Sequence, residues 1–173
     1  FVWDNPSDAL GLLLGKDIPL VEYDMPTLTF SFDWDTFIRI YGPLGARLGL
    51  SLSASIQIGF GYDTLGIRQW IGSGCKDIAS LLNGFYVNDF REGVDVDELC
   101  FHGELTAAAE VNAGVKAGVG GGVGVNVMFN LNDPNKDGKI RLGEIKEMAK
   151  LQDGFLGIFD VHGNITAKLY AYV

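Results

Sequence analysis

The chain has 173 residues, with 22 acidic and 13 basic side chains and a formal net charge of −9. This length suits one domain with a sizeable core, the acidic balance disfavours nucleic acid as a partner, and no apolar run is long enough for a transmembrane helix. Because the chain begins at Phe1 with no signal-like segment, we expect residues 1–173 to form a single β-rich module excerpted from a larger multidomain protein.

A short helix capped by Ser7 is predicted at 7–14, and two long alternating segments follow it. Apolar residues occupy the even positions of 28–40 and of 48–62, as in strands that place successive side chains on opposite faces of a sheet. Turn-forming residues at 41–45 separate the two segments. The pattern predicts a long hairpin or two neighbouring long strands.

A longer alternating segment spans 105–131, with apolar residues at its odd positions. One strand of that length would be too long for a domain of this size, at about 3.3 Å per residue, so we expect it to fold back at Gly120-Gly121-Gly122. Short helices are predicted at 78–82 and 143–151, and a last strand at 165–173. The fold class is therefore mainly β: an antiparallel sheet system of long strands, sandwich or barrel-like, with a few short helices.

The alternation also predicts a core. If the apolar face of the strands is buried, so are the following residues: Leu50, Ile56, Ile58, Phe60, Val111, Val115 and Val125. The opposite face carries small or polar residues such as Ser51, Ser53, Gln57 and Asn112. A face of small residues is flat, so we expect a neighbouring sheet or domain to approach it closely.

One motif has a specific chemistry, the twelve-residue segment 133–144, which matches an EF-hand-like calcium loop. The residues expected to ligate Ca²⁺ are Asp133, Asn135, Asp137, Lys139 through its carbonyl, and Glu144 as a bidentate carboxylate. Gly138 stands where the loop must turn sharply. The alternative is an Asx-rich turn between a strand and a helix. Because a strand enters the loop and three basic side chains offset its acids, we expect weak calcium binding, with a Kd of about 10⁻⁵ to 10⁻³ M. We expect the bound ion to stiffen the connection between the strand and the helix.

Cys75 and Cys100 are the two cysteines of the chain. An even number in an oxidising compartment suggests a disulfide between them, and a pair of buried free thiols in a reducing compartment is the alternative. His102 and His162 are more typical of solvent-facing strand positions than of metal ligands, because no Cys-x-x-Cys or His-x-x-x-His spacing completes a site.

Acidic residues also gather at 89–98, as Asp89, Glu92, Asp95, Asp97 and Glu98. Such a run can bind a second cation but is more typical of a solvated acidic loop. Asp33 and Asp35 beside Trp34 would suit a sugar site, whereas the simpler interpretation is an exposed strand face with a buried indole. No nucleophile, phosphate-loop or Cys-His signature is present, so we expect no enzyme activity.

Several segments together resemble a Gly-rich module of very large, adhesin-like, multidomain surface proteins of environmental bacteria. They are 12–17, 23–26, 42–45, 60–66, 118–124, 130–133 and 165–173. The resemblance covers nearly the whole chain. It implies an extracellular, calcium-associated, modular setting without catalytic residues, and it carries over only the ligands of the calcium loop.

Three functions follow as hypotheses. The first is a non-catalytic, calcium-stabilised structural or adhesion module of a large bacterial extracellular, cell-surface or filament-forming protein. Its partners would be neighbouring domains or copies of itself. The second is a fragment of an outer-membrane β-barrel, which long alternating strands suit. The third is a carbohydrate-binding or hydrolytic domain with a surface glycan as ligand, supported only by Trp3, Trp34, Trp70 and the tyrosines.

Overall fold

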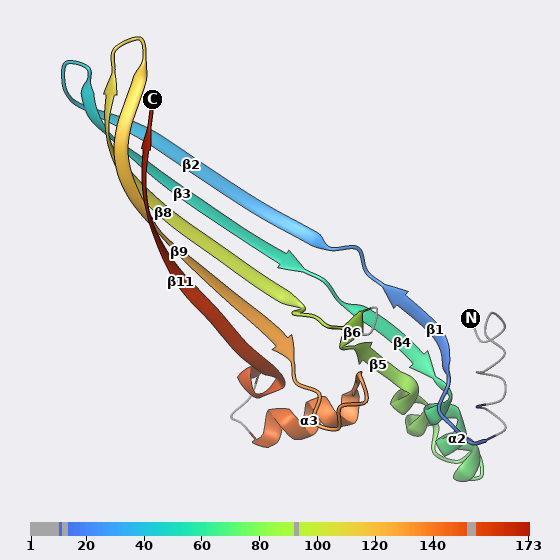
Figure 1. Cartoon of the computed structure of the whole chain (residues 1–173). Helices are drawn as coiled ribbons and strands as arrows, with labels where there is room; N and C mark the ends of the chain where they lie inside the picture. The colour runs from blue at the N-terminus through green and yellow to red at the C-terminus, as the bar shows by residue number, and fades with distance from the viewer. Residues whose placement is uncertain (1–10, 12–13, 92–93, 152–154) are drawn as a thin grey trace. The chain divides into compact units, whose positions relative to one another are not determined.

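The computed structural model describes residues 11, 14–91, 94–151 and 155–173 (Figure 1). The predicted helix at 7–14 lies almost entirely outside these residues. The chain divides into two compact units, each assembled from three segments. Unit 1 comprises Phe1–Thr27, Gln57–Glu98 and Asn130–Asp160, and unit 2 comprises Leu28–Ile56, Leu99–Phe129 and Val161–Val173. The sheets of both units are antiparallel, which confirms the mainly β fold class.

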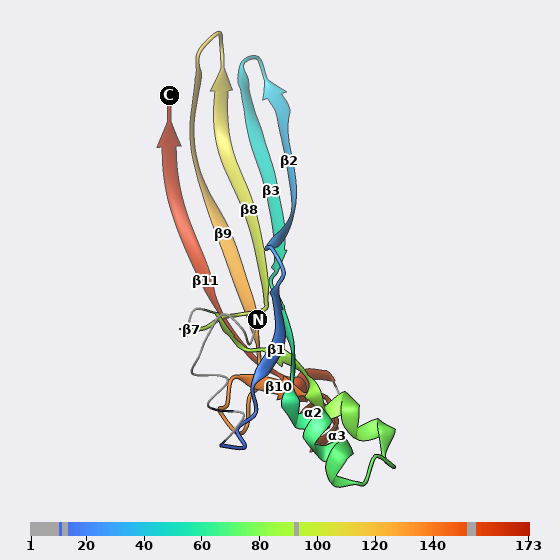
Figure 2. The same ribbon diagram turned by 90° about the vertical axis from the view of Figure 1, so that its right-hand side faces the viewer.

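Unit 2 is built on one five-stranded sheet in the order β11-β9-β8-β3-β2 (Figures 1 and 2). Its strands are β2 (Leu28–Tyr41), β3 (Leu44–Ile56), β8 (Leu99–Asn112), β9 (Lys116–Leu131) and β11 (Phe159–Tyr172). The predicted hairpin at 28–62 is confirmed for β2 and β3, which turn at Gly42 (φ +53°). The segment 48–62, however, breaks at Gln57 and continues as β4 (Gly59–Asp63) in unit 1.

The predicted fold-back at Gly120–Gly122 is wrong. Strand β9 runs straight through the three glycines, and the chain turns earlier, after Asn112, where Gly114 has φ +86°. Only glycine adopts that backbone conformation without strain. Gly120 stays in the strand because β8 lies so close that a Cβ there would be 2.4 Å from the carbonyl oxygen of Ala107.

The two faces of this sheet follow the sequence alternation, as the register Phe32↔Leu52↔Gly103↔Val125 shows. The expectation that the apolar face is buried is wrong. Val111, Val115 and Val125 are exposed, as is Phe60 on β4, and Leu50, Ile56 and Ile58 are only half-buried. The following large apolar side chains of unit 2 are also exposed: Leu28, Phe30, Phe32, Trp34, Ile38, Ile40, Leu44, Leu52, Phe101, Leu105, Val119, Val123, Val161, Ile165 and Leu169. Nothing within the described part of unit 2 covers them.

The opposite face of the sheet carries its own polar packing. Glu110 on β8 is fully buried and accepts bonds from Arg47 on β3 (Nε–Oε2 2.5 Å) and from the Tyr172 hydroxyl on β11 (2.5 Å). These two donors hold the pKa of Glu110 down to about 2. Tyr172 reaches across β9 because Gly118 has no side chain, and a Cβ there would be 2.7 Å from the tyrosine ring. At Gly118, therefore, the side chain of Tyr172 lies over the face of small residues.

Unit 1 holds a four-stranded sheet in the order β1-β4-β5-β10 and a small two-stranded sheet, β6–β7. The new strands are β1 (Pro19–Asp24), β5 (Phe85–Asn88), β6 (Phe90–Arg91), β7 (Val94–Asp95) and β10 (Lys139–Arg141). The predicted helices at 78–82 and 143–151 are confirmed as the 3₁₀ helix η2 (Ile78–Gly84) and as α3 (Leu142–Leu151). Helix α2 (Thr64–Gly72) was not predicted, and η3 (Phe155–Ile158) is a further short helix.

The apolar core of unit 1 centres on Leu131, Ile140 and Met148. Half-buried apolar side chains pack against these three: Val87, Ile145, Ile158 and Phe159. Strands β5, β9 and β10 and helix α3 all contribute to this cluster. Ile140 belongs to the segment 133–144, so the predicted calcium loop contributes one side chain to the core of unit 1.

Candidate metal centre

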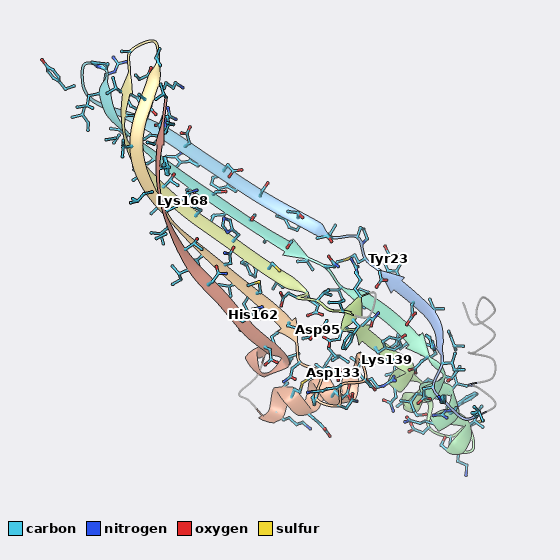
Figure 3. All side chains as sticks on the ribbon, in the orientation of Figure 1. Tyr23, Asp95, Asp133, Lys139, His162 and Lys168 are labelled. Carbon is cyan, nitrogen blue, oxygen red and sulfur yellow. The ribbon has the colours of Figure 1, made fainter. Side chains whose placement is uncertain are left out.

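The segment 133–144 connects the end of β9 to α3 and contains β10 (Figure 3 labels Asp133 and Lys139). Asp133 and Lys139 are half-buried, whereas Asn135 and Asp137 are exposed. Ile140 is 0% exposed and points into the core of unit 1. Strand β10 pairs with β5 through Lys139↔Asn88 and Ile140↔Val87, so the second half of the loop is fixed by both a sheet and a core contact.

The first half of the loop is organised by Asp133. Its Oδ1 accepts from the amide of Lys136 at 3.0 Å, and its Oδ2 accepts from the amide of Gly138 at 2.7 Å. Gly138 has φ +77°, which favours glycine, and a Cβ at this position would be 2.8 Å from the ring of Phe90. The sharp turn that the motif requires is therefore present.

The remaining oxygen side chains turn back onto the loop in the same way. Asn135 Oδ1 accepts from the amide of Asp137, and Asp137 Oδ1 accepts from that of Lys139, both at 2.8 Å. Glu144 Oε2 accepts from the amide of Arg141 at 2.8 Å, and Asn135 Nδ2 donates to Glu144 Oε1 at 2.5 Å. The last contact joins Asn135 and Glu144, the third and twelfth residues of the loop, through the amide nitrogen of Asn135.

The electrostatics of the loop disfavour the negative charge of Glu144. Burial raises the pKa of the Glu144 carboxyl, and the neighbouring charges of Asp137 and Asp133 raise it further. A divalent cation would relieve this repulsion. Within the described ranges, no group of three or more His, Cys, Asp or Glu side chains is gathered closely enough to hold a metal ion. The three carboxylates of the predicted donor set, Asp133, Asp137 and Glu144, are therefore not gathered into such a group.

A buried ion cluster ties the loop to the rest of unit 1, and the sequence patterns did not indicate it. Asp63 is 0% exposed and contacts Lys139 Nζ at 3.1 Å and Arg141 Nη2 at 2.7 Å. Burial acts to raise the pKa of Asp63, but hydrogen bonds and charge from Arg141 and Lys139 outweigh it, so the pKa is lowered. Asp63 Oδ1 also accepts from the amide of Leu65 and caps α2. The loop is thus coupled to this helix through two of its own side chains.

The acidic run at 89–98 is only partly the solvated loop that its composition suggests. Asp89 and Glu98 are each 3% exposed, whereas Asp95 is exposed. Burial raises the pKa of Asp89 to about 6, and the charges of Asp95 and Asp133 add to the effect. Burial likewise raises the pKa of Glu98 to about 7. Two carboxyls of this run are therefore enclosed beside the calcium loop.

The other candidate residues do not form sites. Cys75 and Cys100 are free thiols that belong to different units, so the predicted disulfide is absent from the structure. On β2, Asp33 accepts from the Ser51 hydroxyl on the polar face of the sheet, whereas Trp34 lies on the apolar face. The acids and the indole considered for a sugar site therefore point to opposite sides.

The two histidines lie on unit 2 strands. His102 Nδ1 is 2.7 Å from Asn126 Oδ1 and half-buried, and His162 on β11 is exposed. Neither belongs to a group of ligand side chains among the residues described.

Comparison with models of known protein families, with curated proteins and with solved structures finds no match. No helix in the described part of the chain is long and apolar enough to cross a membrane.

Proposed function

We propose that this chain is a non-catalytic structural module of a larger bacterial extracellular or cell-surface protein. Its five-stranded sheet packs against the apolar sheet face of a second copy, or of a neighbouring domain like it. The observation that carries the proposal is the exposed apolar face of unit 2. Exposed apolar patches on monomers rarely exceed a few hundred Å², and larger ones mark interaction surfaces.

The composition of this face supports an apolar partner. Along all five strands its positions hold aliphatic or aromatic side chains, alanine, glycine and one threonine, and none is charged. Phe30, Phe32 and Phe101 surround a hollow of about 460 Å³ whose floor includes Ala54 and Gly103. An opposing sheet would fill such a hollow with its own side chains, as inner faces do in a sandwich.

The association of the whole chain tests this proposal. We expect the wild-type chain to self-associate without detergent, and Phe32→Glu to weaken the association, because it places a charge in the middle of the apolar contact. Analytical ultracentrifugation over a concentration series measures the effect. Ser53→Glu is the matched control, because Ser53 lies one position from Leu52 on the opposite face. A monomeric wild-type chain would exclude a second copy as the partner, and equal loss of association in both variants would contradict the role of the apolar face.

A second candidate function, as part of an outer-membrane β-barrel, is supported by the exposure of the apolar face of the sheet and the burial of Glu110 on its polar face. Its polar face holds the buried Glu110, while its apolar face is uncovered, which is the arrangement of strands that cross an outer membrane. Strands β2, β8 and β11 have 14 residues each, and a membrane-crossing strand needs about 9 to 11. Flotation with phosphatidylcholine vesicles distinguishes the two functions. Flotation of the wild type but not of Phe32→Glu favours the membrane, whereas self-association without flotation favours sheet packing.

We also propose that calcium bound by Asp133, Asn135, Asp137, the Lys139 carbonyl and Glu144 stabilises the module. Hydrogen bonds from backbone amides to the side chains of the loop support this proposal. They fix the conformation of the proposed ligand residues along 133–144. Weak binding suits extracellular calcium. The ion would fix the loop against α2 and α3 through Ile140, Lys139 and Arg141.

Thermal unfolding in millimolar calcium and in chelator measures this stabilisation. At about 1 mM free calcium, one bound ion contributes about 2.7 kcal/mol to the free energy of unfolding if Kd is about 10⁻⁵ M, and about 0.4 kcal/mol if Kd is about 10⁻³ M. Glu144→Gln should lose this contribution, because the bidentate carboxylate is gone. Glu147→Gln is the control, since it removes the same charge from an exposed position of the same helix. Superimposable wild-type curves in calcium and in chelator would refute the proposal.

A further inference from the structure

Three side-chain oxygens beside the calcium loop are enclosed without a hydrogen-bond partner among the described residues. They are Asp89 Oδ1, Glu98 Oε1 and Asn130 Oδ1. Asp89 and Glu98 are each 3% exposed. A buried polar atom without a partner costs about 1 to 3 kcal/mol, and a charged group costs more, so three together need an explanation.

These atoms belong to segments that are bonded to one another. The amide of Leu131 donates to Glu98 Oε2 at 2.6 Å, and Asn130 Nδ2 donates to Asp95 Oδ1 at 2.7 Å. The amide of Val96 donates to the carbonyl of Asp89 at 3.4 Å. The acidic segment and the end of β9 therefore form one cluster, in which the two carboxylates and the amide each keep one oxygen uncommitted.

No ion pair offsets the charge of this cluster within the described part of the chain. Among the described residues, no lysine or arginine forms an ion pair with Asp89 or Glu98. The charges of Asp89 and Asp95 raise the pKa of Glu98 further, after burial itself. Oxygen atoms in a dry, negatively charged setting are the donors that a hard divalent cation prefers.

We propose that Asp89, Glu98 and Asn130 form a second calcium site in unit 1, separate from the loop at 133–144. The two carboxylates and the amide oxygen supply the protein ligands, and water completes the shell, as is common for calcium. This site connects the 88–98 segment to the end of β9. The inference is independent of the loop, because the two sites share no ligand.

Isothermal titration of the intact chain with calcium chloride tests the second site by stoichiometry. We expect two calcium ions per wild-type chain and one per chain in Asp89→Asn and in Glu98→Gln. Glu144→Gln should also bind one, at the site proposed here, and the control Glu147→Gln should bind two. Both Asp89→Asn and Glu98→Gln should melt no lower than wild type in chelator, because each replaces an unpaired buried carboxyl by a neutral amide.

The outcomes separate this site from the loop. Two ions retained in Asp89→Asn would overturn the second site. So would a single wild-type ion that is lost in Glu144→Gln, which would leave the loop proposal intact. A single ion that is lost in Asp89→Asn and kept in Glu144→Gln would support the second site and contradict the loop. If either Asp89→Asn or Glu98→Gln fails to fold, the stoichiometry of the other variant decides the test.

Discussion

Replacing Asp63 by asparagine is expected to lower the free energy of unfolding by about 3 kcal/mol, because removing one partner of a buried ion pair leaves its charge uncompensated. Two cations depend on this carboxylate, Lys139 at 3.1 Å and Arg141 at 2.7 Å. Their side chains are 20% and 14% exposed, so each can turn only partly to water. The expected loss therefore lies at the lower end of the range for buried pairs.

The substitution by asparagine removes the charge of Asp63 but keeps a side-chain oxygen that can cap α2. It accepts the N-cap hydrogen bond about as well as aspartate, so α2 keeps its first turn. Asp77→Asn is the matched control, because Asp77 caps η2 through the amide of Ala79 but is exposed. Urea denaturation of both variants measures the difference, and the control should change by no more than about 0.5 kcal/mol. Equal losses in the two variants would show that the ion cluster adds nothing beyond the cap.

Replacing Ile140 by alanine is expected to cost about 2 to 5 kcal/mol, the range for truncating a fully buried isoleucine. Ile140 is 0% exposed and packs with Leu131 and Met148. It also lies within the proposed calcium loop, so the same variant should reduce any stabilisation that calcium provides. The truncation leaves a cavity beneath β10, and the loop ligands lose the contact that positions them.

Ile71→Ala is the control for this truncation. Ile71 is 59% exposed on α2, so its loss creates no cavity, and alanine is the better helix former. Urea denaturation with and without calcium compares the two variants. An Ile140→Ala chain that unfolds like Ile71→Ala, with an unchanged calcium response, would show that the loop is not anchored in the core of unit 1.

Much of the fold was predictable because its signals are local. Strand periodicity located β2, β3 and β11, since the two faces of a strand follow directly from the order of residues. The spacing of oxygen side chains around Gly138 located the loop, because ligand order in such a loop is a property of twelve consecutive residues. The helix α2 was missed because its nine residues include two glycines and lack a clear apolar stripe, and its cap depends on Asp63.

Two further predictions differ from the structure because contacts with distant residues decide the conformation of these segments. The glycines at 120–122 were interpreted as a turn, but the close approach of Ala107 and Ala108 on β8 requires glycine within the strand itself. The acidic run at 89–98 was interpreted as a solvated loop, whereas its ends are enclosed by contacts with residues 130–138, more than thirty positions away along the chain.

By itself, the sequence determined which side chains of unit 2 share a face, because alternation assigns each residue to one side of its strand. It also determined the order of the oxygen side chains in the loop at 133–144. The tertiary structure alone decided that the apolar face is the exposed one, because burial depends on what lies above a sheet and not on its pattern. It alone brought Asp63 to Lys139 and Arg141, and Glu98 to Leu131, because such contacts join segments whose separation no local spacing records.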